Sequence, residues 1–216
     1  VARNRGAELA TSNVLFFVDA DVVVQPGTID RVREAFATHA GLDALVGSYD
    51  DTPGDPAFLS QYRNLLHHYT HQVAGHQLAD SGPYATLSTF WTGCGAVRRD
   101  LFRQLGGFDE SYPVPCIEDI EFGYRLTDAG HRIGIDPDLQ VKHLKAWDAA
   151  GMIRTDVFQR AAPWAELLLK RGEAENTLNV DRQSRLSVMA VGAMLASGVA
   201  ATFRPRAALP ISCIKN

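Results

Sequence analysis

The sequence has 216 residues, of which 25 are acidic and 21 basic, so its net charge is -4 with histidine neutral. Apolar residues make up 46% and charged residues 21%, which is typical of a globular protein with a sizeable core and excludes a disordered, collagen-like or disulfide-scaffold chain. The slightly acidic balance argues against a nucleic-acid partner. The three cysteines are far apart and form no CxxC motif, a pattern typical of a reducing compartment.

The first part of the chain alternates between predicted helices and strands. Residues 1–11 have the mixed small and charged composition of a helix end. The apolar run at 14–18 predicts a strand buried on both faces, as in a parallel sheet. A helix is expected to begin at Pro26-Gly27-Thr28, and the run at 42–49 predicts a further strand.

The middle of the chain continues this alternation. We expect a polar helix at 57–78, a mobile loop at 79–88 and a strand broken by two glycines at 89–97. The later predicted elements are a short helix at 99–105, a helix at 117–129, two short strands at 132–135 and 139–144, and a helix at 149–171. The order of elements therefore predicts an α/β fold with a mostly parallel sheet.

Histidines gather in the predicted helix at 57–78. His67 and His71 are spaced i, i+4, as two zinc ligands on one helix face would be. The glutamate of an HExxH zinc motif is absent, so we expect these histidines to form a solvated face instead.

The C-terminal segment differs from the rest. Residues 186–203 carry no charge, and arginines flank the run on both sides. An uncharged run of this length is at the lower limit for a transmembrane helix. The run is rich in alanine, glycine and serine, which leaves a buried core helix as the alternative. We predict a membrane span at 186–203, in contact with membrane lipid.

Two carboxylates, Asp19 and Asp21, directly follow the first predicted strand in LFFVDADVVV. Open α/β sheets bind ligands at the carboxyl ends of their strands, and carboxylate oxygens suit Mg²⁺ or Mn²⁺. The pair predicts a metal site that can hold a diphosphate, with a simple turn as the alternative. Residues 19–23 also match the DxDx(T/V) pattern of haloacid-dehalogenase-like phosphatases, in which the first Asp is the nucleophile and the second a general acid/base.

Three later motifs carry further candidate chemistry. They are Trp91-Thr92-Gly93-Cys94-Gly95-Ala96, Gly106-Gly107-Phe108-Asp109-Glu110 and Ile117-Glu118-Asp119-Ile120-Glu121. Glycines allow the backbone to approach a bound molecule closely. Asp119, at the start of a predicted helix, is placed to act as a general base on an alcohol. Glu118 and Asp119 would also stabilise a helix N-terminus without any catalytic role.

In this order the motifs resemble those of family 2 glycosyltransferases with the GT-A fold. The resemblance rests on the Ala-Arg-Asn-Arg-Gly start, the strand ending in Asp-Ala-Asp, the Gly-Cys-Gly strand, the Gly-Gly-Phe-Asp-Glu segment and the Glu-Asp pair, and it covers residues 1 to about 150. It implies an inverting transfer of a sugar from a nucleoside-diphosphate donor to a hydroxyl group. The implied acceptor is a glycan or lipid-linked, as in cell-envelope polysaccharide synthesis, with the catalytic domain in the cytoplasm at the membrane.

The resemblance also implies roles for single residues. Asp119 would be the catalytic base, and Glu118 would orient the acceptor or the base. A divalent metal, Mg²⁺ or Mn²⁺, would be held by Asp21 with Asp19 and, as in some GT-A enzymes, by His143. The residues implied to bind donor or substrate are Arg3, Asn4, Asp19, Trp91, Gly93, Cys94 and Gly95.

The expected organisation is that of a partial catalytic domain. The family's nucleotide-binding βαβ region, which takes about 30 residues or more, has no room before Val1. We therefore expect an internal fragment that is inactive by itself. The expected segments are the catalytic part at 1–148, a membrane-proximal helical segment at 149–185, the span at 186–203 and a truncated tail at 204–216. A catalytically silent domain that binds a carbohydrate or a partner protein is the alternative from another class.

Overall fold

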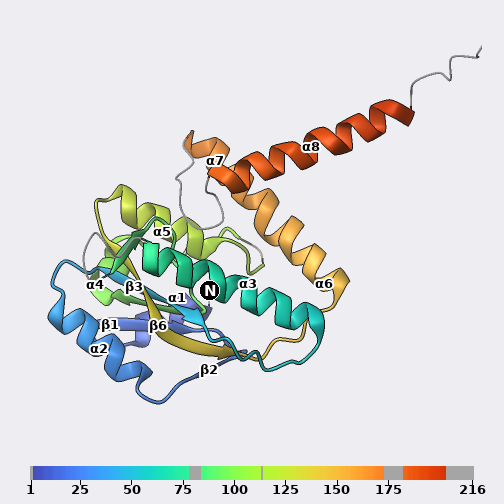
Figure 1. Cartoon of the computed structure of the whole chain (residues 1–216). Helices are drawn as coiled ribbons and strands as arrows, with labels where there is room; N and C mark the ends of the chain where they lie inside the picture. Colours follow the sequence, from blue (N-terminus) through green and yellow to red (C-terminus); the bar gives the residue numbers. More distant parts are fainter. Residues whose placement is uncertain (1, 78–83, 113, 173–181, 203–216) are drawn as a thin grey trace, which may run out of the picture. The chain divides into compact units, whose positions relative to one another are not determined.

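A computed structural model describes residues 2–77, 84–112, 114–172 and 182–202 of the chain (Figure 1). The chain divides into two units, Val1–Leu178 and Asn179–Asn216. The first unit holds a sheet with helices on both faces, and the second contributes the helix α8 (Arg182–Thr202). The candidate chemistry lies entirely in the first unit.

The described strands form one six-stranded mixed sheet with the order β1-β5-β3-β6-β2, in which β4 pairs with β6 beside this path. The strands are β1 (Val14–Val18), β2 (Val22–Val24), β3 (Ala44–Tyr49), β4 (Ala85–Leu87), β5 (Cys94–Arg98) and β6 (Ile133–His143). Only β3 and β6 run parallel among these described strands. The α/β class is confirmed, whereas the prediction of a mostly parallel sheet is wrong. Continuous apolar runs indicate burial on both faces, and helices bury both faces of this mixed sheet as well.

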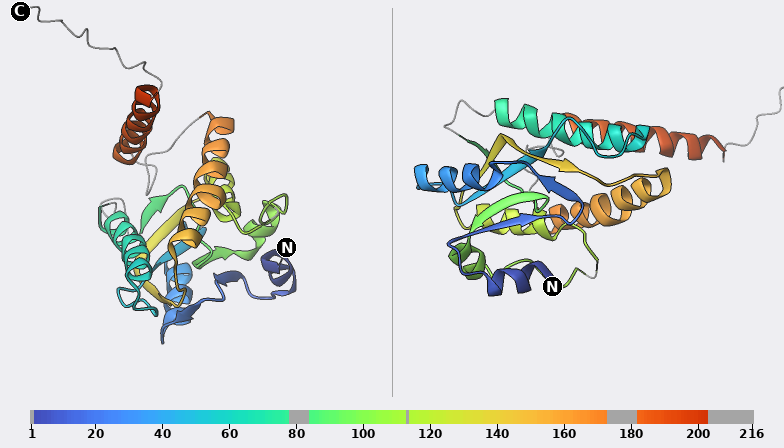
Figure 2. Two further views of the ribbon diagram at one scale, coloured as in Figure 1. Left: turned by 90° about the vertical axis from the view of Figure 1, so that its right-hand side faces the viewer. Right: turned by 90° about the horizontal axis from the view of Figure 1, so that it is seen from below.

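Helices lie on both faces of the sheet (Figure 2). Buried side chains between the helices and the sheet form two hydrophobic cores. The helices of the sheet unit up to residue 128 are α1 (Ala2–Leu9), α2 (Thr28–Thr38), α3 (Phe58–Gln77), α4 (Arg99–Gln104) and α5 (Glu118–Asp128). On one face, residues from α1, α4 and α5 surround buried phenylalanines such as Phe90 and Phe122. On the other face, α2 packs Val32 and Phe36 against the sheet. Strand β3 contributes to both cores, so all six of its residues are buried.

Strand β1 is less buried than its apolar sequence predicts. Leu15 is in the core, whereas Val18 is 38% exposed. In the described part of the chain β1 pairs with one neighbour, β5, and so forms an edge of the sheet. The expectation of burial on both faces is therefore wrong at the carboxyl end of this strand, where the acidic motif begins.

Strand β6 is continuous where the sequence predicts two short strands. Its pairing with β3 shifts register between Val46 and Ser48 of β3. Pro137 lies at this point in β6 and has no N–H to donate to the ladder. The second half of β6 pairs with β2 and ends at His143. The predicted loop at 79–88 also differs, because its described end forms β4, while residues 78–83 lie outside the described residues.

The predicted helix at 149–171 is present as one helical run of three parts. These are α6 (Ala149–Arg154), the π-helical turn η2 (Thr155–Ala161) and α7 (Ala162–Arg171). Pro163 has no N–H for the carbonyl of Gln159 four residues earlier. The Cys116 thiol donates to that carbonyl instead, at 2.9 Å, and so fixes η2 against the loop before α5.

Helix α8 contains the described part of the predicted membrane span. Among the described residues, none of the helices is both long and apolar enough to cross a membrane. The prediction of a span at 186–203 is therefore not supported. The arginines of the first turn and the many alanine, glycine and serine residues lower the hydropathy of this helix. Residue 203 and the predicted tail at 204–216 lie outside the described residues.

Candidate functional site

One arginine brings together two of the acids that the sequence analysis singled out. Arg3 on α1 donates from Nη2 to Asp19 Oδ1 and from Nη1 to Glu118 Oε1, each at 2.7 Å. Asp19 follows β1 and Glu118 begins α5, so Arg3 joins the end of the neighbouring strand to a helix that starts 115 residues further along the chain. Glu118 Oε2 also accepts a hydrogen bond of 2.7 Å from the backbone N–H of Cys116. A pocket of about 410 Å³ opens beside Arg3, Asp19 and Glu118.

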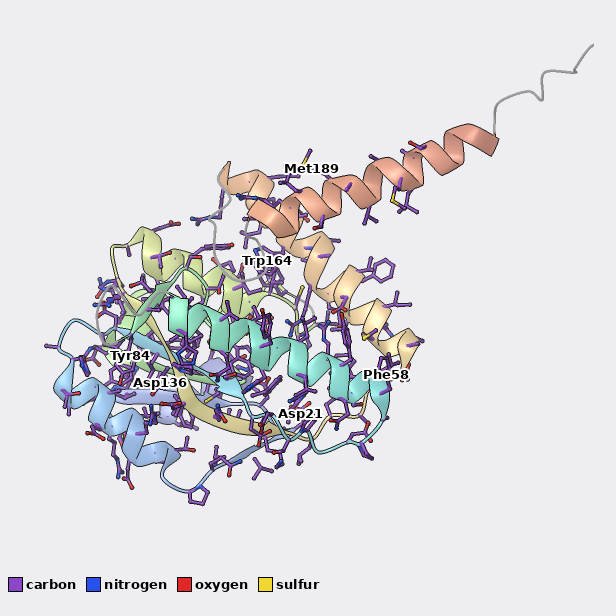
Figure 3. All side chains as sticks on the ribbon, viewed as in Figure 1. Asp21, Phe58, Tyr84, Asp136, Trp164 and Met189 are labelled. Atoms are coloured by element: carbon purple, nitrogen blue, oxygen red, sulfur yellow. The ribbon has the colours of Figure 1, made fainter. Side chains whose placement is uncertain are left out.

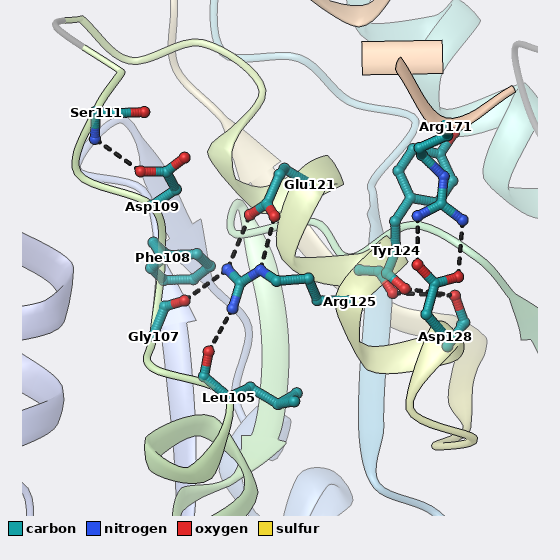
Figure 4. Close-up of polar contacts among 12 residues, drawn as sticks. Leu105, Gly107, Phe108, Asp109, Ser111, Glu121, Tyr124, Arg125, Asp128 and Arg171 are labelled. Atoms are coloured by element: carbon teal, nitrogen blue, oxygen red, sulfur yellow. Dashed lines mark hydrogen bonds and ion pairs between the residues drawn. The ribbon is translucent and has the colours of Figure 1, made fainter. Parts of the chain in front are cut away.

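Part of the lining of this pocket is formed by Phe108, Asp109 and Glu110 of the Gly-Gly-Phe-Asp-Glu segment. Figure 4 shows the contacts by which α5 holds this segment in place. Arg125 on α5 pairs with Glu121 and donates to the carbonyls of Leu105 and Gly107. Asn4, predicted to lie near the nucleotide, donates to the Phe108 carbonyl at 2.8 Å and accepts from the Phe108 N–H at 2.9 Å. Asn4 therefore fastens α1 to this segment.

Asp119 lies beside the Arg3 cluster but has its own partners. Its Oδ2 accepts from the backbone N–H of Thr92 at 3.2 Å and from the Thr92 hydroxyl at 3.1 Å. Its Oδ1 accepts from the N–H of Ile120 at 2.9 Å. Burial raises the pKa of Asp119 above its ordinary value, against the lowering effect of the Arg160 guanidinium. An oriented carboxylate with a raised pKa suits proton transfer in catalysis.

Asp21 and His143 meet at another edge of the sheet, where Figure 3 labels Asp21. The register of β2 and β6 sets Val22 opposite His143, and the Leu144 N–H donates to the Asp21 carbonyl at 2.8 Å. Asp21 Oδ2 lies 3.7 Å from His143 Nε2. The His143 ring stacks on Tyr49 with centroids 4.2 Å apart. Burial lowers the pKa of His143, so its imidazole is neutral at pH 7 and available as a metal ligand.

The Asp21–His143 pair fits a divalent metal as part of a ligand set. Mg²⁺ in particular is commonly bound through one or two carboxylates, with substrate phosphates and water filling its other positions. Across the described residues, there is no group of three or more His, Cys, Asp and Glu side chains arranged to hold a metal. Asp19, predicted as a further ligand, is engaged by Arg3. The candidate ligands are therefore Asp21 and His143.

The Trp-Thr-Gly-Cys-Gly motif is divided between the site and the core. Thr92 bonds to Asp119, and Trp91 packs edge-on against Tyr49 with centroids 4.9 Å apart. A Cβ at Gly93 would lie 2.3 Å from the Trp91 ring, and one at Gly95 would lie 2.2 Å from the Trp91 carbonyl oxygen. Cys94 is fully buried, and burial raises its thiol pKa to about 12. The structure thus places Cys94 and Gly95 in the packed sheet, away from any described pocket lining.

The expected solvated face of histidines on α3 is wrong. His68 donates to the Tyr49 carbonyl at 2.7 Å, and His71 donates to the Gly47 carbonyl at 2.8 Å. The His67 ring packs against Tyr49 and Trp91, with centroids 4.4 Å away in each case. Burial lowers the pKa of His71 to about 4 and the pKa of His67 well below its ordinary value. His67 and His71 are therefore neutral, and all three histidines belong to the packing between α3 and the sheet.

Two residues near Asp119 were given no catalytic or binding role by the sequence analysis. Thr92 is visible in its motif, yet only the fold shows that it bonds to Asp119. Arg160 lies on η2, where it is exposed and affects the pKa of Asp119. Within the described residues Arg160 makes no hydrogen bond or ion pair. Its place depends on the π-helical turn, which the sequence pattern does not indicate.

With this geometry established, the comparison of sequences identifies the class of protein. Residues 1–160 match the profile described as "Glycosyltransferase like family 2", and the chain belongs to this family. The match includes residues 19–23, so the resemblance of that stretch to haloacid-dehalogenase-like phosphatases loses its support.

Two bacterial enzymes are among the particular relatives of this chain. Validoxylamine A glucosyltransferase of Streptomyces hygroscopicus subsp. jinggangensis is 26% identical over 188 residues, covering 75% of this chain and 44% of the relative. Pre-mycofactocin glycosyltransferase of Mycobacterium tuberculosis is 26% identical over 144 residues, covering 66% of this chain and 29% of the relative. The chain thus spans less than half the length of these relatives.

A solved structure is also similar. It is described as "Mannosyltransferase PcManGT from Pyrobaculum calidifontis in complex with GDP-Man and Mn2+". It is 21% identical to this chain, with a TM-score of 0.48, and the match covers 94% of this chain and 59% of the other.

Proposed function

We propose that this chain carries the catalytic part of a metal-dependent inverting glycosyltransferase. Its donor would be a nucleoside-diphosphate sugar, and its acceptor a hydroxyl of a glycan or of a lipid-linked sugar. The observation that carries this proposal is the convergence of Asp19 and Glu118 on Arg3, with Asp119 as the next residue of α5. Family membership and the glycosyltransferase names of the two relatives support the same reaction class.

Asp119 is the proposed general base. Its Oδ2 is oriented by the N–H and hydroxyl of Thr92, so the carboxylate has one fixed position. The acceptor oxygen would form a bond to the anomeric carbon while the bond from that carbon to the diphosphate oxygen breaks. The acceptor proton would pass to Asp119, and the electron pair of the broken bond would leave with the nucleoside diphosphate.

We propose that Arg3 and Glu118 hold the base and the donor in a fixed position relative to each other. The Arg3 guanidinium fixes both Asp19 and Glu118 beside the pocket of about 410 Å³. Asp21 and His143 would hold a divalent cation, which when bound would neutralise charge on the diphosphate. His143 is buried, whereas the Asp21 side chain is 44% exposed. A cation held by the pair would therefore be reached by the donor from the side of the Asp21 carboxylate.

The test is release of nucleoside diphosphate by an enzyme that contains this chain, from a panel of nucleotide sugars in the presence of Mn²⁺ and sugar acceptors. Asp119→Asn should reduce release by about 10²–10⁴-fold, the range for removal of a general base. Asp109→Asn is the matched control, because Asp109 also borders the pocket but bonds to the nearby Ser111 N–H. Equal turnover by wild type and Asp119→Asn would refute the role of the base.

The same experiment distinguishes the proposed glycosyltransferase from a catalytically silent binding domain. Such a domain would bind a sugar or partner equally well with either residue at position 119 and release no diphosphate. Release of inorganic phosphate from phosphomonoesters, lost in Asp19→Asn, would instead favour a phosphatase and overturn the proposal.

A further inference from the structure

Helix α3 is amphipathic in the inverted sense, with its polar side buried and its apolar side exposed. The buried positions repeat at the spacing of one helix face and are Ser60, Asn64, His71 and Gly75. The opposite face carries exposed large side chains, which are Phe58, Tyr62, Leu65, Leu66 and Tyr69. We call these five residues the α3 outer face. A surface helix normally turns its apolar stripe towards the core, so this orientation requires a cause.

Hydrogen bonds on the buried side fix the orientation of α3. Ser60 Oγ accepts from the Trp147 N–H at 2.8 Å, and Asn64 Nδ2 donates to the Asp50 carbonyl at 2.9 Å. His71 donates to the carbonyl of Gly47 at 2.8 Å. Rotation of the helix about its axis would leave these buried polar groups without hydrogen-bond partners, which costs free energy. Burial of the apolar outer face would have to gain more free energy than this cost before the helix could turn. The outer face is therefore held outwards by the fold.

The α3 outer face is a continuous apolar strip. Phe58 is 79% exposed and Tyr69 is 65% exposed, and the rings of Phe58 and Tyr62 stack with centroids 6.4 Å apart. Phe58 to Tyr69 covers about 16 Å along the helix axis at 1.5 Å per residue. Phe58 is the first residue of α3, and Figure 3 labels it there. Contiguous exposed apolar patches of this kind mark interaction surfaces.

The charges around α3 favour an anionic partner. Residues 56–79 contain no Asp or Glu, although the whole chain has 25 acidic residues in 216. Arg63 of α3 pairs with Asp156 of η2 at 2.7 Å, which brings the two helices side by side. The same helical run exposes further apolar side chains at Ile153, Val157 and Phe158. It also exposes Arg154, which makes no ion pair among the described residues.

We propose that the α3 outer face lies in the interfacial layer of an anionic phospholipid bilayer. Leucine and phenylalanine would enter the acyl boundary, and the two tyrosines would keep their hydroxyls at the headgroup level. An acid-free helix avoids repulsion from negative headgroups, and Arg154 adds attraction. A helix that lies in the surface plane in this way does not have to span the bilayer. This surface is separate from the proposed transfer reaction and does not depend on it.

Vesicle flotation of the full chain tests the proposal. Leu65→Gln/Leu66→Gln should weaken binding to vesicles that contain phosphatidylglycerol by about tenfold or more, because each lost leucine removes apolar burial. The matched control is Leu9→Gln/Ile29→Gln, which changes two exposed apolar residues of α1 and α2 and should leave binding unchanged. Equal binding by the two double variants would overturn the proposal, because other parts of the chain would then account for attachment.

A fluorescent probe on the α3 outer face separates a bilayer from a protein partner. An environment-sensitive dye would be attached to Leu66→Cys with Cys116 and Cys213 replaced by serine, since Cys94 is buried. We expect a blue shift of emission only when anionic vesicles are added. Blue-shifted emission without vesicles, or dimers in sedimentation that Leu65→Gln/Leu66→Gln dissociates, would show that protein covers this face and would overturn the proposal.

Discussion

Gly123 of α5 is the position where a single methyl group should disturb the candidate site. An alanine Cβ there would lie 2.3 Å from the backbone nitrogen of Phe90 and 2.7 Å from the carbonyl carbon of Thr89. Both are backbone atoms, so no side-chain rotation can relieve the contact. Gly123→Ala must therefore move α5 away from the segment that carries Thr92, the partner of Asp119.

The magnitude follows from two opposing effects. Alanine in place of a helical glycine stabilises a helix by about 1 kcal/mol. Overpacking a tight contact costs about 1–3 kcal/mol, and a contact with backbone lies towards the upper end. We expect Gly123→Ala to lower the free energy of unfolding by about 1–2 kcal/mol, combining these ranges. Gly6→Ala in α1 is the matched control, because its Cβ would meet nothing within 4 Å.

Urea unfolding followed by tryptophan fluorescence measures this difference, since the three tryptophans all lie in the first unit. Gly6→Ala should stabilise the protein by about 0.5–1 kcal/mol, whereas Gly123→Ala should destabilise it. Sugar transfer by Gly123→Ala should also fall, mainly in kcat, as the distances of 3.1 and 3.2 Å from Thr92 to Asp119 lengthen. Stabilisation by Gly123→Ala equal to that by Gly6→Ala would refute the packing argument.

The remaining predictions concern the charges of the site. The acid limb of the pH profile of kcat/KM should lie above the ordinary range of an aspartate, because burial raises the pKa of Asp119 and only the deprotonated carboxylate can accept a proton. Arg160→Gln should move that limb to still higher pH, since it removes a charge that lowers this pKa; a limb that stays in place would contradict the role of Arg160. Asp21→Asn should raise the Mn²⁺ concentration needed for half-maximal diphosphate release, and chelation by EDTA should abolish release by the wild type; metal-independent turnover would disprove the ligand assignment. Glu118→Gln should leave Arg3 with one charged partner and reduce transfer less than Asp119→Asn does, which parallel kinetics would check.

The sequence alone determined the class of the fold and the candidate acids. Hydrophobic periodicity located most strands and helices, because it reports which faces are buried. The order of short motifs indicated the family and singled out Asp19, Asp21, Glu118 and Asp119. These features depend on residues that are close in the chain, so local patterns were sufficient to find them.

The tertiary structure decided how those acids are arranged and which way each element faces. Arg3 and Glu118 are 115 residues apart, and only the folding of the chain brings their side chains within a hydrogen bond of 2.7 Å. Strand direction was predicted wrongly, because apolar runs show burial and not the sense of pairing. The histidines of α3 were also placed wrongly, because hydrogen bonds from its polar side to the sheet outweighed the usual burial of apolar residues. Such hydrogen bonds join residues that are far apart in the chain, so they cannot be predicted from a short stretch of sequence.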